Sequence, residues 1–176
     1  MRLRALSVES LLEWDRRWTR RLNASVGVAP VRTLFRVVSR LGNGVIWYLL
    51  MLALAMTQGR IGLETSLRML AAGTIGLAFY KLLKSTTTRP RPYRVLRDIR
   101  AGIAPLDAFS FPSGHTLHAV AFTTVAVFYF PVLTAVLVPF TLLIALSRVV
   151  LGLHYPSDVL AGAAIGAGVA HAVLLV

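Results

Sequence analysis

The sequence predicts an all-α integral membrane protein, a bundle of about five transmembrane helices preceded by amphipathic helices in the membrane interface. Its 176 residues are 56% hydrophobic, and their mean hydropathy of +0.70 is typical of membrane proteins. Apolar runs of near membrane length recur along the chain, and basic residues gather between them. The length suits one domain, and the absence of cysteine excludes a disulfide framework and thiolate metal sites.

The N-terminal segment, residues 1–40, is predicted to hold two amphipathic helices. Over residues 7–23, apolar side chains that include Trp14 and Trp18 recur at helical spacing, while most arginines fall on the other side. This pattern favours a helix lying in the membrane interface over one packed on the protein's own surface. Residues 30–41 form a second basic helix. Arginines crowd the segment and no long apolar core interrupts them, a pattern unlike a signal peptide.

Five apolar runs follow in the predicted transmembrane core, residues 41–176. They cover residues 45–57, 67–83, 115–130, 132–146 and 159–176. The first run is short against the ~20 residues that a spanning helix usually needs, so its flanks must complete it. Glycine and alanine are frequent in the second and last runs, where small residues let membrane helices approach closely. With an odd number of spans, the polar loop 84–114 and the turn 148–158 lie on the same membrane face as the N-terminal segment.

The net charge of +12 indicates an anionic partner. On a soluble protein it would suggest nucleic acid. Here the basic residues lie outside the apolar runs, so lipid headgroups or phosphate substrates are expected instead of nucleic acid. All of the 19 Lys and Arg residues except Arg60 and Arg68 fall on the polar face. The positive-inside rule would make that face cytoplasmic, but part of the bias belongs to the polar clusters described next, so the side stays open.

Three polar clusters meet at this face. They are K-x6-R-P at residues 84–92, P-S-G-H at 112–115 and S-R-x5-H-x3-D at 147–158. Lys84, Arg91 and Arg148 supply three cations, a set suited to a dianionic phosphate. A loop as long as 84–114 inside a compact membrane domain usually has a function.

The remaining residues of these clusters indicate the chemistry. Ser113 and Gly114 lead into an apolar helix, whose first N–H groups can face a bound anion. His115 and His154 enter from different helices, which suits one nucleophile and one general acid. Asp158 follows His154 by four residues, so on a helix its carboxylate would orient the imidazole. No carboxylate cluster or cysteine accompanies the histidines, so metal ligation is not expected.

In order and spacing, the three motifs resemble the type 2 phosphatidic acid phosphatase family, which shares its site architecture with vanadium-dependent haloperoxidases and glucose-6-phosphatase. The resemblance covers the chain from about residue 81 to its end, and the earlier spans more loosely. It implies a membrane lipid phosphatase that works through a phosphohistidine without a metal or cofactor. Many membrane members have six spans. This chain departs from that pattern, since amphipathic helices stand where the first span is expected.

The resemblance also implies a role for each motif residue. His154 is the expected nucleophile, Asp158 its orienting partner, and His115 the general acid and then the general base. The phosphate oxygens are expected to bind Lys84, Arg91, Ser113, the Gly114 backbone N–H and Arg148. Arg89 is a possible secondary substrate contact.

The resemblance leaves the substrate open among lipid phosphates and diphosphates. Undecaprenyl diphosphate and phosphatidylglycerophosphate are favoured because the chain is short, while phosphatidic acid and lipid A phosphate are also considered. Phosphotransfer to another lipid, or lipid binding without catalysis, are the alternative functions. A vanadate-dependent peroxidase is disfavoured because those relatives are soluble. The expected location is a bacterial inner membrane.

Overall fold

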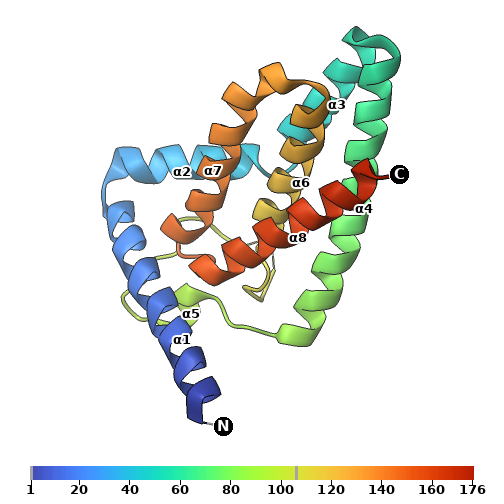
Figure 1. Ribbon diagram of the computed structural model, residues 1–176. Helices are drawn as coiled ribbons and strands as arrows, with labels where there is room; N and C mark the ends of the chain where they lie inside the picture. Colours follow the sequence, from blue (N-terminus) through green and yellow to red (C-terminus); the bar gives the residue numbers. More distant parts are fainter. Residues whose placement is uncertain (1, 106) are drawn as a thin grey trace.

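The computed structural model describes residues 2–105 and 107–176, with side chains from residue 8 onward, and consists of helices joined by one long irregular segment (Figure 1). The helices are α1 (Arg2–Asn23), η1 (Ala24–Gly27), α2 (Ala29–Leu41), α3 (Val45–Thr57), α4 (Gly59–Thr87), α5 (Pro92–Val95), α6 (Gly114–Tyr129), η2 (Pro131–Leu133), α7 (Thr134–Val150) and α8 (Pro156–Leu174). In these residues the β pairing is limited to an isolated bridge between Pro90 and Phe109. The predicted all-α fold is confirmed.

The predicted count of five spans is not confirmed. Among the described residues, three stretches are long and apolar enough to cross a membrane, namely α4, Pro131–Val150 and α8. Helices α2 and α3 pass the same test only as a pair bent by 50°, which fits a broken span or a re-entrant loop. Helix α6 has 16 residues and falls short of a full span. The described residues therefore hold three candidate membrane spans, or four if the bent pair is one.

Helix α4 is longer than its apolar run predicted. It begins at Gly59, whose positive φ of 58° reverses the chain after α3. The polar first turns remain helical, and Arg68 pairs with Glu64 at 3.1 Å one turn earlier. The apolar run missed this part because hydropathy does not detect a charged helix. The helix also continues past the apolar run to Thr87, so Lys84 lies in its last turn.

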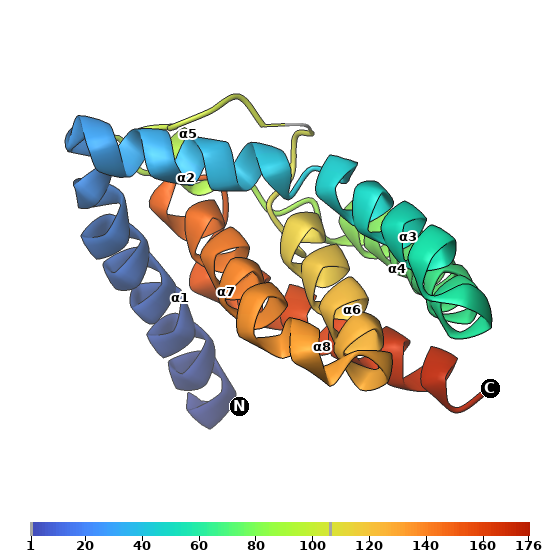
Figure 2. The ribbon, with the colours of Figure 1, turned by 90° about the horizontal axis from the view of Figure 1, so that it is seen from above.

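Helix α6 lies at the centre of the bundle, between α4, α7 and α8 (Figures 1 and 2). Small residues let α8 approach it closely, as the glycine-rich sequence predicted. A Cβ on Gly162 would lie 2.5 Å from the Ser113 carbonyl oxygen, so the two backbones touch here. The Ser113 N–H donates to the Asp158 carbonyl at 3.0 Å. The start of α6 is therefore fixed against the start of α8.

The N-terminal segment packs on the polar end of the bundle. The Asn23 amide donates to the carbonyls of Arg100, at 2.8 Å, and Val150, at 2.9 Å, and its oxygen accepts from the Arg100 N–H at 2.9 Å. This side chain joins α1 to the long loop and to α7, so the expected convergence on one face is present. Trp14 and Trp18 remain exposed on the outer side of α1. The domain boundary near residue 40 stays a prediction.

We expect Gly162→Ala to lower the unfolding temperature of the detergent-solubilised protein by several degrees. The added methyl would push the start of α6 away from α8, an overpacking defect that typically costs about 1–3 kcal/mol. Gly168→Ala is the matched control on the same helix, because nothing lies within 4 Å of its added Cβ. Equal unfolding temperatures for the two variants would contradict the close α6–α8 contact.

Candidate active site

Helix ends bring the predicted site residues together. Lys84 lies in the last turn of α4, and Arg91 precedes α5. Ser113 immediately precedes α6, Arg148 lies near the end of α7, and His154 occupies the turn between α7 and α8. Because these helix ends meet at the same end of the bundle, residues far apart in the sequence gather there, and His154 lies within electrostatic range of Arg148, Arg91 and Lys84.

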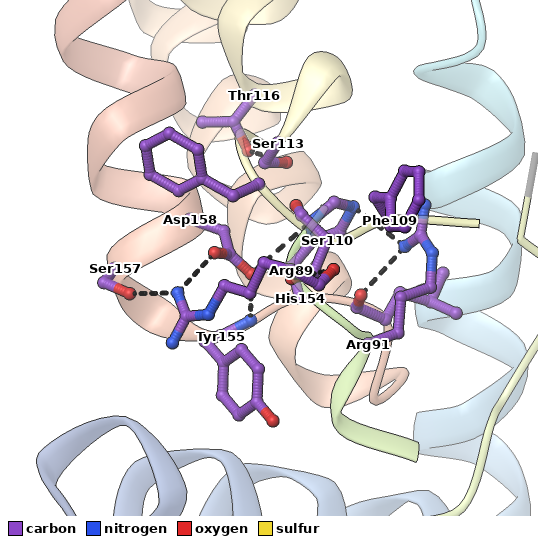
Figure 3. A network of polar contacts seen from close by, with 12 residues as sticks. Arg89, Arg91, Phe109, Ser110, Ser113, Thr116, His154, Tyr155, Ser157 and Asp158 are labelled. Atoms are coloured by element: carbon purple, nitrogen blue, oxygen red, sulfur yellow. Dashed lines mark hydrogen bonds and ion pairs between the residues drawn. The ribbon is translucent and has the colours of Figure 1, made fainter. Parts of the chain in front are cut away.

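His154 is buried and held in one orientation. The side chain is 2% exposed, and its Nδ1 lies 2.6 Å from the Ser110 carbonyl oxygen. A carbonyl only accepts hydrogen bonds, so Nδ1 carries the proton and Nε2 keeps its lone pair. Nε2 lies 3.2 Å from Nη1 of Arg91 (Figure 3). Gly152, with φ of 71°, makes the tight turn that presents this imidazole.

The relation between His154 and Asp158 differs from the expected shared helical face. Helix α8 begins at Pro156, so His154 precedes it. The Asp158 carboxylate caps that helix, and its Oδ2 accepts from the Tyr155 N–H at 2.8 Å. The same oxygen lies 3.8 Å from His154 Nδ1, close enough for electrostatic attraction but too far for a hydrogen bond. Asp158 was expected to orient the imidazole, but His154 Nδ1 instead donates its hydrogen bond to the Ser110 carbonyl oxygen. Ser110 was not predicted as a site residue.

Arg148 provides a buried cation with a free donor. The residue is 3% exposed, and its Nη1 donates to the Ser39 hydroxyl at 2.5 Å. Its Nε is buried without a hydrogen-bond partner among the described residues. A buried N–H without an acceptor costs about 1–3 kcal/mol. Such a donor suits a site that binds an anion.

Asp107 pairs with the other two predicted phosphate-binding cations. Its Oδ1 lies 2.6 Å from Lys84 Nζ and 2.8 Å from Arg91 Nη2, and its Oδ2 accepts from the Tyr80 hydroxyl at 2.5 Å. Burial opposes its ionisation, but hydrogen bonds from Lys84 and Tyr80 hold the pKa of Asp107 well below its ordinary value. Asp107 was not predicted as a site residue, although an acidic residue in an arginine-rich loop was a usable signal.

The second histidine stands at the start of α6. The Ser113 hydroxyl is 2.9 Å from that of Thr116, and His115 follows in the first helical turn. His115 Nε2 contacts the Asn43 side-chain oxygen, in the turn between α2 and α3. His115 also lies within electrostatic range of Arg91, Arg148 and His154. Asn43 was also missed, because its Gly-Asn-Gly context indicated only a helix break.

A lateral groove of about 400 Å³ leads to His115 between α3, α4 and α6. Its lining is mostly apolar and includes Trp47, Met51, Leu70, Leu77 and Phe122, with Gly114 and His115 at the polar end. Such a groove suits a hydrocarbon chain whose polar end reaches the histidine.

Arg89, the possible secondary contact, does not join the Lys84–Arg91 cluster. Its guanidinium points toward Ser157 and Asp158 (Figure 3). Both of its terminal nitrogens are paired with carboxylates. The structure therefore separates Arg89 from the other cations that the motifs singled out.

Known proteins resemble this chain in sequence. The family model of the PAP2 superfamily matches residues 65–176. The lipid A 1-phosphatase of Rhizobium johnstonii is 29% identical over 166 residues, which cover 83% of this chain and 68% of that protein. The decaprenylphosphoryl-5-phosphoribose phosphatase of Mycobacterium tuberculosis is 36% identical over 101 residues, 56% of this chain and 54% of that protein. The chain thus spans only about half of the mycobacterial relative.

Solved structures agree. LpxE of Aquifex aeolicus superposes with a TM-score of 0.78 at 26% identity, over 90% of this chain and 93% of that one. A phosphatidylglycerolphosphate phosphatase from Bacillus subtilis superposes with a TM-score of 0.72 at 22% identity, over 94% of this chain and 85% of that one, and shows the fold alone. Because the family model covers more than half of the chain and includes every motif described above, the chain belongs to the PAP2 superfamily and is a membrane lipid phosphatase.

Proposed function

We propose that the protein hydrolyses a lipid phosphomonoester through a phosphohistidine on His154. The observation that carries this proposal is the state of the buried imidazole, which donates through Nδ1 to Ser110 and keeps the Nε2 lone pair beside a cation cluster. Burial and, next, the charge of Arg148 lower the pKa of His154 well below its ordinary value. A neutral imidazole in a fixed orientation is a ready nucleophile.

In the first step, Nε2 attacks phosphorus and the bond to the lipid oxygen breaks. Arg91 lies beside Nε2, so it can exchange that contact for a phosphate oxygen. Lys84, Arg148 with its free Nε, the Ser113 hydroxyl and the Gly114 N–H complete the set of donors for the pentavalent transition state. The negative charge of the bound phosphate favours the protonated form of His115, which gives its proton to the leaving lipid oxygen.

In the second step, His115 takes a proton from water, and the water oxygen attacks the phosphohistidine. The N–P bond breaks, inorganic phosphate leaves, and His154 regains its starting state. Asp158, 3.8 Å from Nδ1, stabilises the positive charge that the ring carries while it is phosphorylated. Asn43, in contact with His115, holds the acid–base group in place.

The charge of the pocket favours a dianionic substrate. Lys84, Arg91 and Arg148 carry three positive charges, and Asp107 removes one, which leaves two. A phosphomonoester above its second pKa of about 6 carries two negative charges. A terminal diphosphate carries more, so the pocket matches a monoester better. Two relatives named above are, by name, phosphatases of lipid A and of a decaprenylphosphoryl sugar, which supports a phosphorylated lipid as the substrate class.

The lipid portion of the substrate would lie in the apolar groove that ends at His115. A lateral groove lets a lipid reach the pocket without leaving the bilayer. The named relatives are bacterial, and we accordingly place the protein in a bacterial cytoplasmic membrane. Undecaprenyl diphosphate, a favoured substrate on sequence grounds, becomes the diphosphate member of the test panel.

Purified wild-type protein should release inorganic phosphate from a lipid phosphomonoester in the presence of EDTA. The panel contains phosphatidylglycerophosphate, phosphatidic acid, lipid A 1-phosphate and undecaprenyl diphosphate. His154→Ala should lower the rate by at least about a thousandfold, because loss of a nucleophile removes the whole covalent route. Phosphate release is measured colorimetrically, and lipid products are separated to detect transfer to another lipid.

The matched control is His171→Ala, which removes an exposed histidine near the opposite end of α8 and should leave the rate unchanged. Phosphatase activity that disappears with EDTA and returns with a divalent metal would contradict the metal-independent mechanism. A preference for undecaprenyl diphosphate would overturn the monoester assignment, and a phosphorylated acceptor lipid would identify a phosphotransferase.

The protonation of His154 also predicts a pH dependence of stability. Its pKa is lower in the folded protein than in the unfolded chain, so the unfolded chain binds more protons between the two values. Stability is therefore complete above about pH 6.5 and falls as the pH drops below it, by up to about 1.4 kcal/mol per pH unit. We expect His154→Gln to make the fall in unfolding temperature between about pH 7.5 and 5.5 shallower. Parallel curves for the two proteins would contradict the lowered pKa.

A further inference from the structure

The face of α1 that packs against the start of α8, next to the turn that carries His154, is polar. Asp15 is fully buried although its helix is rich in arginine. Its Oδ1 accepts from the Ser157 N–H at 2.9 Å, and its Oδ2 accepts from the Ser157 hydroxyl at 2.5 Å. Oδ2 also pairs with Arg89 Nη2 at 2.7 Å. One carboxylate thus binds both the first turn of α8 and the loop after α4.

Arg89 continues this connection toward the site. Its Nη1 pairs with Asp158 Oδ1 at 2.6 Å and donates to the Ser157 hydroxyl at 2.8 Å (Figure 3). Its guanidinium carbon lies 4.2 Å from the centre of the Tyr155 ring, so stacking adds to the ion pairs. The guanidinium is held between two buried carboxylates and is not available to a substrate phosphate.

Arg89 reaches His154 by two routes. Through its side chain it holds Asp158, which lies 3.8 Å from the imidazole Nδ1. Through its backbone carbonyl it accepts from the Ser110 N–H at 2.8 Å, and the Ser110 carbonyl in turn accepts the Nδ1 hydrogen bond. A shift of Arg89 would therefore disturb both groups that surround Nδ1.

We propose that Asp15 is a positioning residue of the phosphatase, which from α1 fixes Arg89 against Asp158 and so sets the surroundings of His154. This inference rests on the proposed function. It assigns a part in the reaction to the N-terminal helix, which lies outside residues 65–176 that the family model matches. Among the described residues, the Asp15 carboxylate contacts Arg89 and Ser157 and not the three cations or the histidines, so its effect passes through these two residues.

The physical reason is the sharing of one cation between two carboxylates. While Asp15 takes part of the Arg89 charge, Asp158 keeps negative potential for the ring of His154. That potential matters when the ring becomes positive on phosphorylation. Without the Asp15 charge, Arg89 pairs with Asp158 alone and is free to shift toward it. The loss therefore falls on the chemical step and not on substrate binding.

The test is Asp15→Asn, which keeps an acceptor for Ser157 but removes the charge. Measured on the best lipid of the panel, kcat should fall about tenfold to a hundredfold, the usual effect of removing a group that orients a site residue, while KM changes less than about twofold. In an Arg89→Lys background the same change should have a smaller effect on kcat, because a single ammonium group cannot bridge both carboxylates as the guanidinium does.

Asp98→Asn is the matched control. Arg20 of α1 pairs with Asp98 of the same long loop at 2.7 Å, but both side chains are half-exposed, at 51% and 55%. Loss of this surface pair should leave kcat unchanged. If Asp15→Asn does not fold, Ser157→Ala gives the second measurement. It removes the hydroxyl that bonds Asp15 and Arg89, and it should lower kcat severalfold without raising KM.

Distinct results overturn the inference. If the wild type is active and Asp15→Asn has an unchanged kcat, the inference is wrong. If Asp15→Asn does not fold, an unchanged kcat in Ser157→Ala has the same meaning. An increase in KM alone would instead place Arg89 on the substrate. An equal loss of kcat in Asp98→Asn would show that Asp15 acts only by attaching α1 to the bundle, and this would also contradict the inference. A wild-type protein inactive on every lipid of the panel would overturn the proposed function itself.

Discussion

The hydrogen bond from His154 Nδ1 to the Ser110 carbonyl is the contact on which the rest of the site depends. It selects the tautomer, turns Nε2 toward Arg91, and ties the turn between α7 and α8 to the long loop. The loop can hold Ser110 in place because Arg89 binds the Ser110 N–H through its carbonyl and α8 through its side chain. The nucleophile is thus oriented by backbone that the bundle holds rigidly.

The second constraint is the handling of charge inside an apolar bundle. Lys84, Arg91 and Arg148 are buried, and a buried cation is unfavourable without an anion beside it. Asp107 balances Lys84 and Arg91, whereas the Nε of Arg148 keeps an unused donor. The resting pocket is therefore partly neutralised and still positive. This combination keeps the fold stable while leaving two charges for a phosphate dianion.

Much of this arrangement was predictable because helix ends are visible in sequence. The motif around Ser113 precedes an apolar run, and the structure starts α6 at Gly114. The last apolar run was expected from residue 159, and helix α8 begins three residues earlier, at Pro156. What could not be predicted were contacts between segments distant in sequence. Spacing of four residues indicated a His154–Asp158 hydrogen bond, yet helix α8 starts after His154 and the Ser110 carbonyl takes that place.

The charge pattern of the sequence also failed to predict the roles of Asp15 and Arg89, because their partners are distant in the sequence. Asp15 sits among arginines on an amphipathic helix, and only the docking of α1 reveals that it is buried. Arg89 lies within the first motif, but its partners come from α1 and α8. The count of spans was also unreliable, since α2 and α3 meet the length criterion only as a bent pair and α6 is short. Hydropathy measures composition along the chain and does not detect such bends.

The most direct measurement is to trap the intermediate. Protein mixed with a labelled lipid phosphate and quenched in alkali should carry an acid-labile, base-stable phosphoryl group, and peptide mapping should place it on His154. The label should be absent from His154→Ala. In His115→Ala it should form more slowly and, once formed, persist longer than in the wild type, because His115 serves as the acid of the first step and the base of the second. A phosphoryl group on another residue, or an active enzyme in which no labelled intermediate forms, would contradict the account.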